Sequence, residues 1–305
     1  IKATVTYLDG TAKTYTADVK VSTPKAKAST VVVAMQANKM LSVDGTNNYS
    51  NLEWTSSKKS VVEVSKSGLL TPKKKGTATV KGKIDGKTIK VKVYVSNPSI
   101  KDTYSLLGVD QNTKISLKGL AAKSKVTYKT SNKKVATVSK KGVVKAKAAG
   151  RAEIIVNADG KTFTYLVECA PKAAIDACIK GKAIIDVSTY SQDLRMQDGY
   201  YDCSALVFKA YGRNSALLGG SSSWAPTAAN MALHMANTQK VISWTGLPVE
   251  DLRPGDLIFY GNSNNGRYLG IDHVSMYYGN GYRLEKPLSY YWEREDIVMI
   301  ARPVP

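Results

Sequence analysis

The sequence predicts a multidomain chain in which two all-β sandwiches precede an α+β domain. Residues 54–68 align with residues 128–142 at a constant offset of 74, and both copies lie among short alternating strand patterns. After about residue 170 lysine becomes rarer, aromatic residues and glycines increase, and helical periodicity comes before the strand patterns. A chain of 305 residues is long enough for two or three such domains.

The repeat in the N-terminal half has the features of paired strands. Val91, Val93 and Val95 alternate with lysines, as expected of a strand with one buried face. Asp-Gly pairs at 85–86 and 159–160 are typical of hairpin turns and are also 74 residues apart. Several short strands within about seventy residues favour a small β-sandwich in each copy.

The two copies resemble the bacterial immunoglobulin-like repeats of surface proteins. The resemblance rests on a pattern of Trp-x-Ser-Ser, alternating valines and spaced glycines, and it implies modules at 28–97 and 98–169. Residues 1–22 repeat the end of the same pattern. We interpret them as the closing hairpin of a truncated preceding repeat, which we expect to lean on the next module or to be disordered.

The positive charge is confined to the N-terminal half. Residues 1–168 carry 31 Lys+Arg against 11 Asp+Glu, a balance of +20, whereas residues 169–305 carry 13 of each. Such a surface is either simply well solvated or attracts polyanions such as anionic wall polymers. Nucleic acid is disfavoured as a partner because Arg151 is the only arginine in this half and no nucleic-acid motif is present.

Bulk features narrow the class of protein further. No run of about 18 apolar residues occurs, so we expect no membrane span. The chain starts without Met and without a secretory leader, which suggests a trimmed mature form.

Three cysteines cannot all pair, and Cys169 falls on the inward face of its strand with Tyr165 and Val167. We expect a buried core thiol there; the alternative is a bridge to Cys178.

The C-terminal part combines helix and strand patterns. Predicted helices cover 172–180, 203–213 and 225–238, and predicted strands cover 256–261, 273–279, 282–286 and 296–302. Helices followed by a sheet indicate an α+β domain over 170–305.

Cys203 and His273 are the candidate catalytic pair. Cys203 immediately precedes an amphipathic helical segment, and unpaired N–H groups at a helix start favour a thiolate. His273, one of two histidines, stands at the head of an alternating strand and can accept the thiol proton. We expect the other, His234, to have a structural role within its helix.

Three motifs resemble the NlpC-type cell-wall peptidases, a papain-like family of bacterial cysteine hydrolases. They are DCSALV at 202–207, LRPGDLIFY at 252–260 and HVSMYYGNG at 273–281. Ala205 replaces the glycine of the family pattern. The full expectation is therefore two all-β immunoglobulin-like sandwiches followed by a papain-like α+β domain.

The resemblance implies that a third polar residue twelve positions after the histidine, here Glu285, orients the imidazole. A two-residue hairpin loop at 280–281 would point Glu285 away from His273. A three-residue loop at 279–281 would put both on one face, and it also groups the apolar residues on the other face. We favour the three-residue loop, in which Glu285 orients the imidazole. The alternative is that Glu285 is a surface carboxylate.

Substrate residues follow from the same resemblance. Asp202 and Ser204 are expected to bind the free amine of the stem peptide's first residue, although Ser204 could instead cap the helix. Tyr190 matches the tyrosine of a Tyr-x-x-Gly-Gly stretch without its glycines. Tyr201 and Trp224 either line the groove or are packing residues. We expect no cofactor and no metal, because the histidines and cysteines lack zinc spacing and no calcium loop occurs.

The resemblance thus implies a secreted bacterial murein endopeptidase, and the family often cuts stem peptides after γ-D-glutamate. An amidase that cuts the muramoyl–L-alanine bond with the same Cys/His pair is the closest alternative. A non-catalytic wall-binding or adhesion protein is a third. The oligomeric state does not follow from the sequence.

Overall fold

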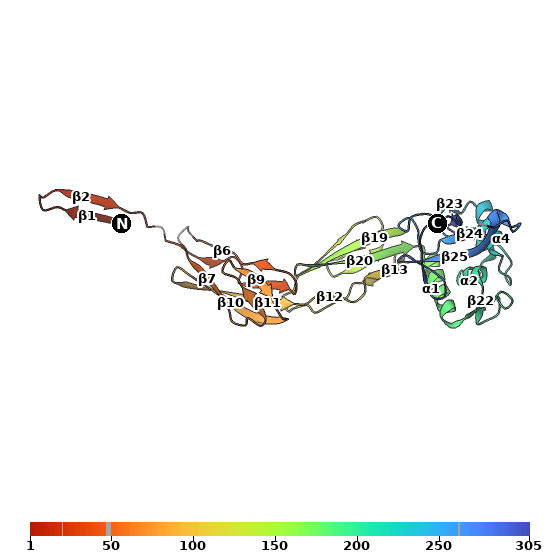
Figure 1. Ribbon diagram of the computed structural model, residues 1–305, viewed down its shortest axis with the longest axis horizontal. Coiled ribbons are helices and arrows are strands. Elements are labelled where there is room, and N and C mark those ends of the chain that lie inside the picture. The colour runs from red at the N-terminus through yellow and green to blue at the C-terminus, as the bar shows by residue number, and fades with distance from the viewer. Residues whose placement is uncertain (20, 47–49, 262) are drawn as a thin grey trace. The chain divides into compact units, whose positions relative to one another are not determined.

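The computed structural model describes residues 1–305 apart from 20, 47–49 and 262. The chain separates into two compact units. The helices and strands of each are labelled in Figure 1. One comprises residues 1–99, 117–126 and 157–162, and the other comprises 100–116, 127–156 and 163–305.

The first unit begins with an exposed antiparallel hairpin, β1 (Lys2–Thr6) and β2 (Ala12–Thr16). A four-stranded sheet follows in the order β4 (Thr30–Ala34), β11 (Lys87–Ser96), β10 (Gly76–Ile84) and β7 (Leu52–Ser56). The smaller sheets are β5 (Lys39–Met40), β9 (Leu69–Pro72) and β8 (Val62–Val64), and the pair β3 (Lys25–Ala26) and β6 (Val43–Asp44). Val80, Val93 and Trp54 pack in the core between the sheets, as the alternating valines predict.

The next part of the chain repeats this arrangement. Its four-stranded sheet has the order β13 (Tyr104–Gly108), β20 (Lys161–Ala170), β19 (Gly150–Ala158) and β16 (Val126–Thr130). A three-stranded sheet contains β14 (Asn112–Lys114), β18 (Val143–Ala146) and β17 (Ala136–Val138), and β12 (Ser99–Ile100) pairs with β15 (Leu117–Lys118). The long hairpin strands of the two copies begin and end 74 residues apart, because the repeated sequence places the same turns and apolar positions in both.

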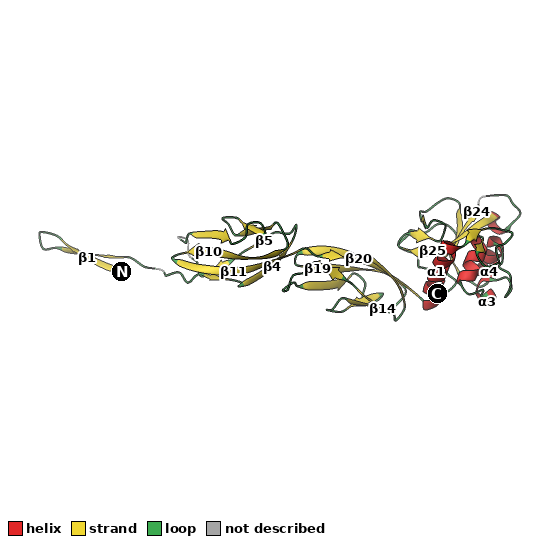
Figure 2. Ribbon diagram, turned by 90° about the horizontal axis from the view of Figure 1, so that it is seen from below, coloured by secondary structure: helices red, strands yellow, loops and turns green. Residues whose placement is uncertain are grey.

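Helices occur only in the C-terminal part of the described chain (Figure 2). They are α1 (Lys172–Val187), α2 (Cys203–Ala210), α3 (Ser215–Leu218), α4 (Ala228–Asn237) and the 3₁₀ turn η1 (Tyr268–Gly270). A six-stranded sheet has the order β23 (Val241–Ser243), β28 (Ile297–Ala301), β24 (Leu257–Gly261), β25 (Ile271–Gly279), β26 (Tyr282–Arg283) and β27 (Ser289–Tyr290). A parallel pair is formed by β21 (Thr189–Tyr190) and β22 (Tyr200–Tyr201).

The main helices and central strands lie where the sequence predicts them, whereas several short strands were not predicted. Each of these strands contains only two or three residues: the paired strands β21 and β22, and the edge strands β23 and β27. Such segments are too short to produce a periodic pattern, and they become strands because a partner lies beside them.

The sheet of this domain is covered on both faces. Val207 and Phe208 of α2 pack with Val274 and Met276 of β25 on the helical side. Each large apolar side chain buried in this way contributes about 1.5–3 kcal/mol. On the other face Tyr277 packs in a separate cluster with aromatic and aliphatic neighbours. The helix that begins at Cys203 and the strand that contains His273 therefore belong to one packed body.

Glu168, on the last strand of the second β repeat, joins that repeat to the sheet of the C-terminal domain. Its carboxylate accepts hydrogen bonds from the hydroxyls of Tyr104 (2.8 Å) and Tyr277 (3.1 Å) and from the backbone N–H of Asn280 (2.6 Å). Glu168 is only 1% exposed. These bonds satisfy the buried charge and fix the strand before α1 to the hairpin after β25.

Two of the three cysteines are core thiols. Cys169 and Cys178 are both free and fully buried, so the expectation of a buried thiol at Cys169 is confirmed and the alternative bridge is not formed. Burial, reinforced by neighbouring Glu168, raises the pKa of Cys169 to about 12. Neither thiol is placed for chemistry at a solvent-exposed site.

Among the described residues, no helix has both the length and the apolar character that a membrane crossing requires.

Candidate active site

Cys203 is the first residue of α2. The helix begins there because Asp202 is extended and its side chain accepts a hydrogen bond from the Ala205 backbone N–H at 2.7 Å. Cys203 is partly exposed, whereas the residues that follow it in the helix are buried. The thiol is therefore accessible at the positive end of a well-anchored helix.

His273 lies near the start of β25, opposite Tyr260 of β24. Its Nε2 is 3.5 Å from Oε1 of Glu285. The register that joins them is the predicted one: Tyr277 pairs with Arg283, which sets residue 275 opposite residue 285. The loop itself contains only Asn280 and Gly281, because Gly279 pairs with Tyr282, so the predicted three-residue loop at 279–281 is wrong. A bulge between Tyr277 and Gly279 shifts the register by one residue and restores the predicted pairing of residue 275 with residue 285. Glu285 therefore reaches the imidazole just beyond the end of β26.

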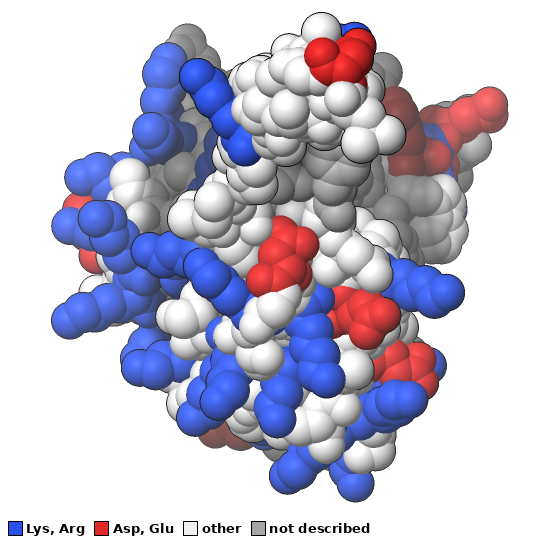
Figure 3. Space-filling model, turned by 90° about the vertical axis from the view of Figure 1, so that its left-hand side faces the viewer, with Lys and Arg blue, Asp and Glu red and all other residues white. Residues whose placement is uncertain are grey.

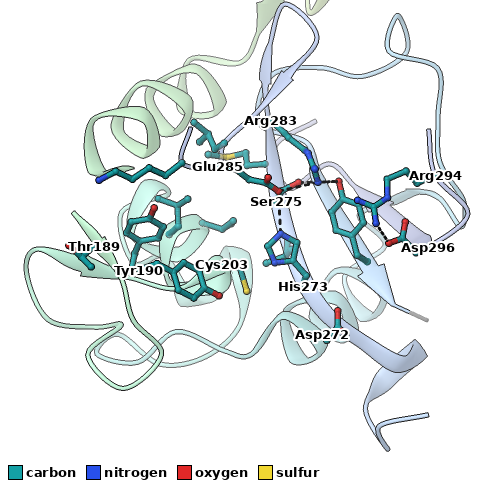
Figure 4. A pocket seen from close by; sticks show the side chains of 18 residues that line it. Thr189, Tyr190, Cys203, Asp272, His273, Ser275, Arg283, Glu285, Arg294 and Asp296 are labelled. Carbon is teal, nitrogen blue, oxygen red and sulfur yellow. Dashed lines mark hydrogen bonds and ion pairs between the residues drawn. The ribbon is translucent and has the colours of Figure 1, made fainter. Parts of the chain in front are cut away.

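The two candidate catalytic side chains share one open cavity of about 790 Å³. Figure 4 shows the Cys203 sulfur beside the His273 ring, with Glu285 joined to the ring by a dashed line. The elements α2, β25 and the segment after β26 thus bring together three residues that are far apart in the sequence.

The electrostatics of this group favour a charged imidazole. Burial alone would lower the pKa of His273, but its hydrogen bonds to Cys203 and Glu285 raise that pKa to about 9. Burial acts to raise the pKa of Glu285, yet His273 and Arg283 outweigh it and lower that pKa. At neutral pH the histidine is therefore held protonated beside an ionised carboxylate.

Arg283 and Tyr260 extend this group, and sequence reasoning did not identify them. Arg283 Nη1 is 3.0 Å from Glu285 Oε1 and donates to the Tyr260 hydroxyl at 2.8 Å. The Tyr260 ring lies 5.5 Å from that of His273. Arg283 follows from the predicted pairing of residues 275 and 285, because it lies on the same strand face as Glu285, two residues away. Its contact with Tyr260 depends on β24 lying beside β25, which the sequence alone does not reveal.

Tyr190 and Tyr201 form another part of the cavity lining. Tyr190 is 51% exposed, and its hydroxyl accepts a hydrogen bond from the backbone N–H of Cys203. Tyr201 is buried and packs edge-on against Tyr190, with ring centroids 5.7 Å apart. Tyr190 is therefore the tyrosine placed to contact a bound molecule, and Tyr201 supports it.

The other three residues expected at the substrate site lie outside this cavity. Asp202 and Ser204 are 5% and 1% exposed, and the Asp202 carboxylate is already paired with Arg195 at 2.8 Å. The structure therefore does not offer them as an open subsite for an amine. Trp224 lines a separate cavity of about 570 Å³ together with Arg195 and His234.

His234 has a packing environment rather than a catalytic one. Its Nε2 lies 3.1 Å from the carbonyl oxygen of Ala216, which ties α4 to the short helix α3. In the part of the chain that the structure describes, no group of three or more His, Cys, Asp or Glu side chains could hold a metal ion.

Comparisons with solved structures give weak similarities. Domains 4 and 5 of the S-layer protein SbsC share 22% identity over 43% of this chain and 82% of that chain, with a TM-score of 0.21. A larger SbsC structure shares 20% identity over 49% of this chain and 28% of that chain, with a TM-score of 0.22. An intimin mutant of EHEC O157:H7 shares 18% identity over 23% of this chain and 39% of that chain, with a TM-score of 0.19. No curated protein matches the chain.

Family profiles match two consecutive segments. Residues 94–168 match the bacterial Ig-like domain (group 2), and residues 190–293 match the NlpC/P60 family. The second segment contains Cys203, His273 and Glu285. The chain thus combines a bacterial Ig-like domain with a C-terminal NlpC/P60 domain, in the order that its motifs predict.

Proposed function

We propose that residues 170–305 form a cysteine endopeptidase that cuts peptidoglycan stem peptides after γ-D-glutamate. NlpC/P60 is a family of cell-wall cysteine peptidases, and this supports the general class. The observation that carries the proposal is the partly exposed Cys203 facing a His273 that is paired with Glu285, within a cavity large enough for a peptide.

The reaction follows from this geometry. Glu285 lies beside Nε2 of His273, which leaves Nδ1 as the ring nitrogen that exchanges a proton with the thiol. The Cys203 thiolate attacks the peptide carbonyl carbon, and His273 donates its proton to the departing amine nitrogen as the C–N bond breaks. Water, deprotonated by the same imidazole, then releases the acyl group and restores the thiolate.

The Tyr190 hydroxyl is a donor for the developing oxyanion close to the sulfur. Its oxygen accepts from the backbone N–H of Cys203 at the start of α2, which leaves its own O–H to donate to the substrate oxygen. Donors fixed in advance stabilise the tetrahedral intermediate without reorganisation, and removing one typically costs about 10²–10³ in kcat. Tyr190 therefore has a role in the transition state as well as in lining the cavity.

The test is digestion of purified peptidoglycan with the full chain, followed by mass spectrometry of the products. We expect fragments cleaved within the stem from the parent protein and none from Cys203→Ala. Cys178→Ala removes a buried thiol and is the matched control; it should cleave like the parent. Intact released stems would instead support the amidase. Equal cleavage by Cys203→Ala would refute both enzymatic functions and leave a wall-binding protein.

The N-terminal half supports a second part of the proposal. We infer that residues 28–97 are a further immunoglobulin-like module, that 98–169 is the one matched by the family profile, and that 1–22 is the end of another repeat. Basic side chains outnumber acidic ones on the side drawn in Figure 3. Such modules suit a protein of the bacterial cell envelope or its exterior, held electrostatically to anionic wall polymers.

This tether is tested by co-sedimentation with purified cell walls. We expect retention at low salt that is lost as salt rises towards about 1 M, where the Debye length falls to about 3 Å. A variant with module lysines changed to glutamine should show the same loss at low salt. Retention that does not respond to salt or to these substitutions would contradict an electrostatic tether.

A further inference from the structure

Arg195 forms a buried ion pair with the residue that precedes the nucleophile. Its Nη1 lies 2.8 Å from Oδ2 of Asp202, and the exposed fractions of the two side chains are 11% and 7%. Arg195 Nη2 also donates to the carbonyl oxygens of Ala225 (2.7 Å) and Pro226 (3.1 Å). The guanidinium is thereby fixed on the side of Asp202 that faces the loop before α4.

The remaining acceptor atom of Asp202 is occupied as well. Oδ1 accepts a hydrogen bond from the Ala205 N–H at 2.7 Å and another from the Ser204 hydroxyl at 3.3 Å. Both oxygens of this carboxylate thus have donors inside the protein, and its charge is balanced by Arg195. Asp202 is also absent from the lining of the cavity around Cys203.

A substrate ammonium would therefore meet a neutralised, enclosed carboxylate next to the nucleophile. Binding there would require Arg195 to leave a buried pair, and an arginine separated from its carboxylate in such a place is strongly destabilised. A substrate with an uncharged amide in place of the ammonium could bind without breaking the pair between Arg195 and Asp202. The ion pair thus selects against a positive charge at the start of the peptide.

We propose that Arg195 is the specificity-determining counter-ion of Asp202, and that the protein cleaves stem peptides whose first residue is acylated in preference to peptides with a free amino terminus. This inference rests on the proposed endopeptidase function. The substrate is then intact wall polymer, in which an amide bond still attaches the amino terminus of the stem peptide. A reaction that releases free stem peptides would follow this cleavage and would not supply its substrate.

The test compares two synthetic tetrapeptides that differ only at the amino terminus. Both contain L-alanine, γ-linked D-glutamate, a diamino acid and D-alanine; one has a free amine and the other is N-acetylated. The full chain is assayed with each for kcat/KM at neutral pH. We expect the acetylated peptide to be cleaved faster than the free one.

Variants then link this preference to Arg195. Arg195→Met should shift the kcat/KM ratio at least tenfold towards the free amine, because Asp202 loses its internal counter-ion. Arg195→Lys should retain most of the parent preference, and Arg195→Met combined with Asp202→Asn should abolish the new one. Arg267→Met, at an exposed arginine outside the cavity, is the matched control and should leave the ratio unchanged.

The outcomes separate the two proposals. A parent protein that cleaves the free-amine peptide as fast as the acetylated one, or faster, overturns the role of Arg195 while leaving the endopeptidase intact, whether or not the variants fold. A ratio that Arg195→Met leaves unchanged in a folded, active protein has the same consequence. Failure to cleave either peptide or whole peptidoglycan overturns the endopeptidase and this inference with it.

Discussion

Glu285→Gln should move the alkaline limit of activity towards lower pH. His273 must be protonated to donate to the leaving amine, and its pKa of about 9 keeps it protonated through neutral pH. Activity is therefore expected to fall as the pH rises through about 9. The glutamine removes the charge that lies 3.5 Å from Nε2 and helps to hold that pKa up.

The size of the expected pKa shift of His273 depends on how the charge of Glu285 is shared between His273 and Arg283. An opposite charge at about 4–6 Å shifts a pKa by about 1–3 units. Glu285 also lies 3.0 Å from Arg283, and the His273 side chain is 37% exposed, so part of its effect is compensated or screened. We expect the low end of the range, a shift of about one unit, with about tenfold less imidazolium on the alkaline side.

The assay is the pH dependence of kcat/KM on peptidoglycan fragments. Glu250→Gln, an exposed carboxylate in the loop before β24, is the matched control and should reproduce the parent profile. Alkaline limbs that coincide for the parent and Glu285→Gln would refute the reasoning, because the carboxylate would then have no electrostatic effect on the imidazole.

Two further predictions concern stability. Arg302 holds the fully buried Asp256 through bonds of 2.8 and 2.7 Å, so Arg302→Met should destabilise the C-terminal domain by about 3–5 kcal/mol in urea unfolding. A loss below about 1 kcal/mol would contradict this. Glu168→Gln removes the charged acceptor shared by two tyrosines and the Asn280 N–H, which should cost about 1–3 kcal/mol and speed hydrogen exchange at the Asn280 amide. An unchanged exchange rate would mean that Glu168 does not hold this hairpin.

Local sequence was sufficient wherever the signal lies within one element or one repeat. The offset of 74 residues predicted the strands of the second β repeat, because both copies place turns and apolar residues at the same spacing. The polar residue before an amphipathic segment predicted the start of α2 at Cys203. Alternating burial also predicted the pairing that brings Glu285 to His273, but not the two-residue loop and the bulge between Tyr277 and Gly279 that produce it.

What only the tertiary structure decided is which partner each polar side chain has. A sequence shows that Asp202 stands next to Cys203, but it does not show that Arg195, in a separate loop, neutralises it, or that Trp224 turns into a different cavity. Arg283 and Tyr260 likewise meet through neighbouring strands. Ion pairs and cavities depend on distances between segments that are set by packing of the whole domain, and no local pattern encodes those distances.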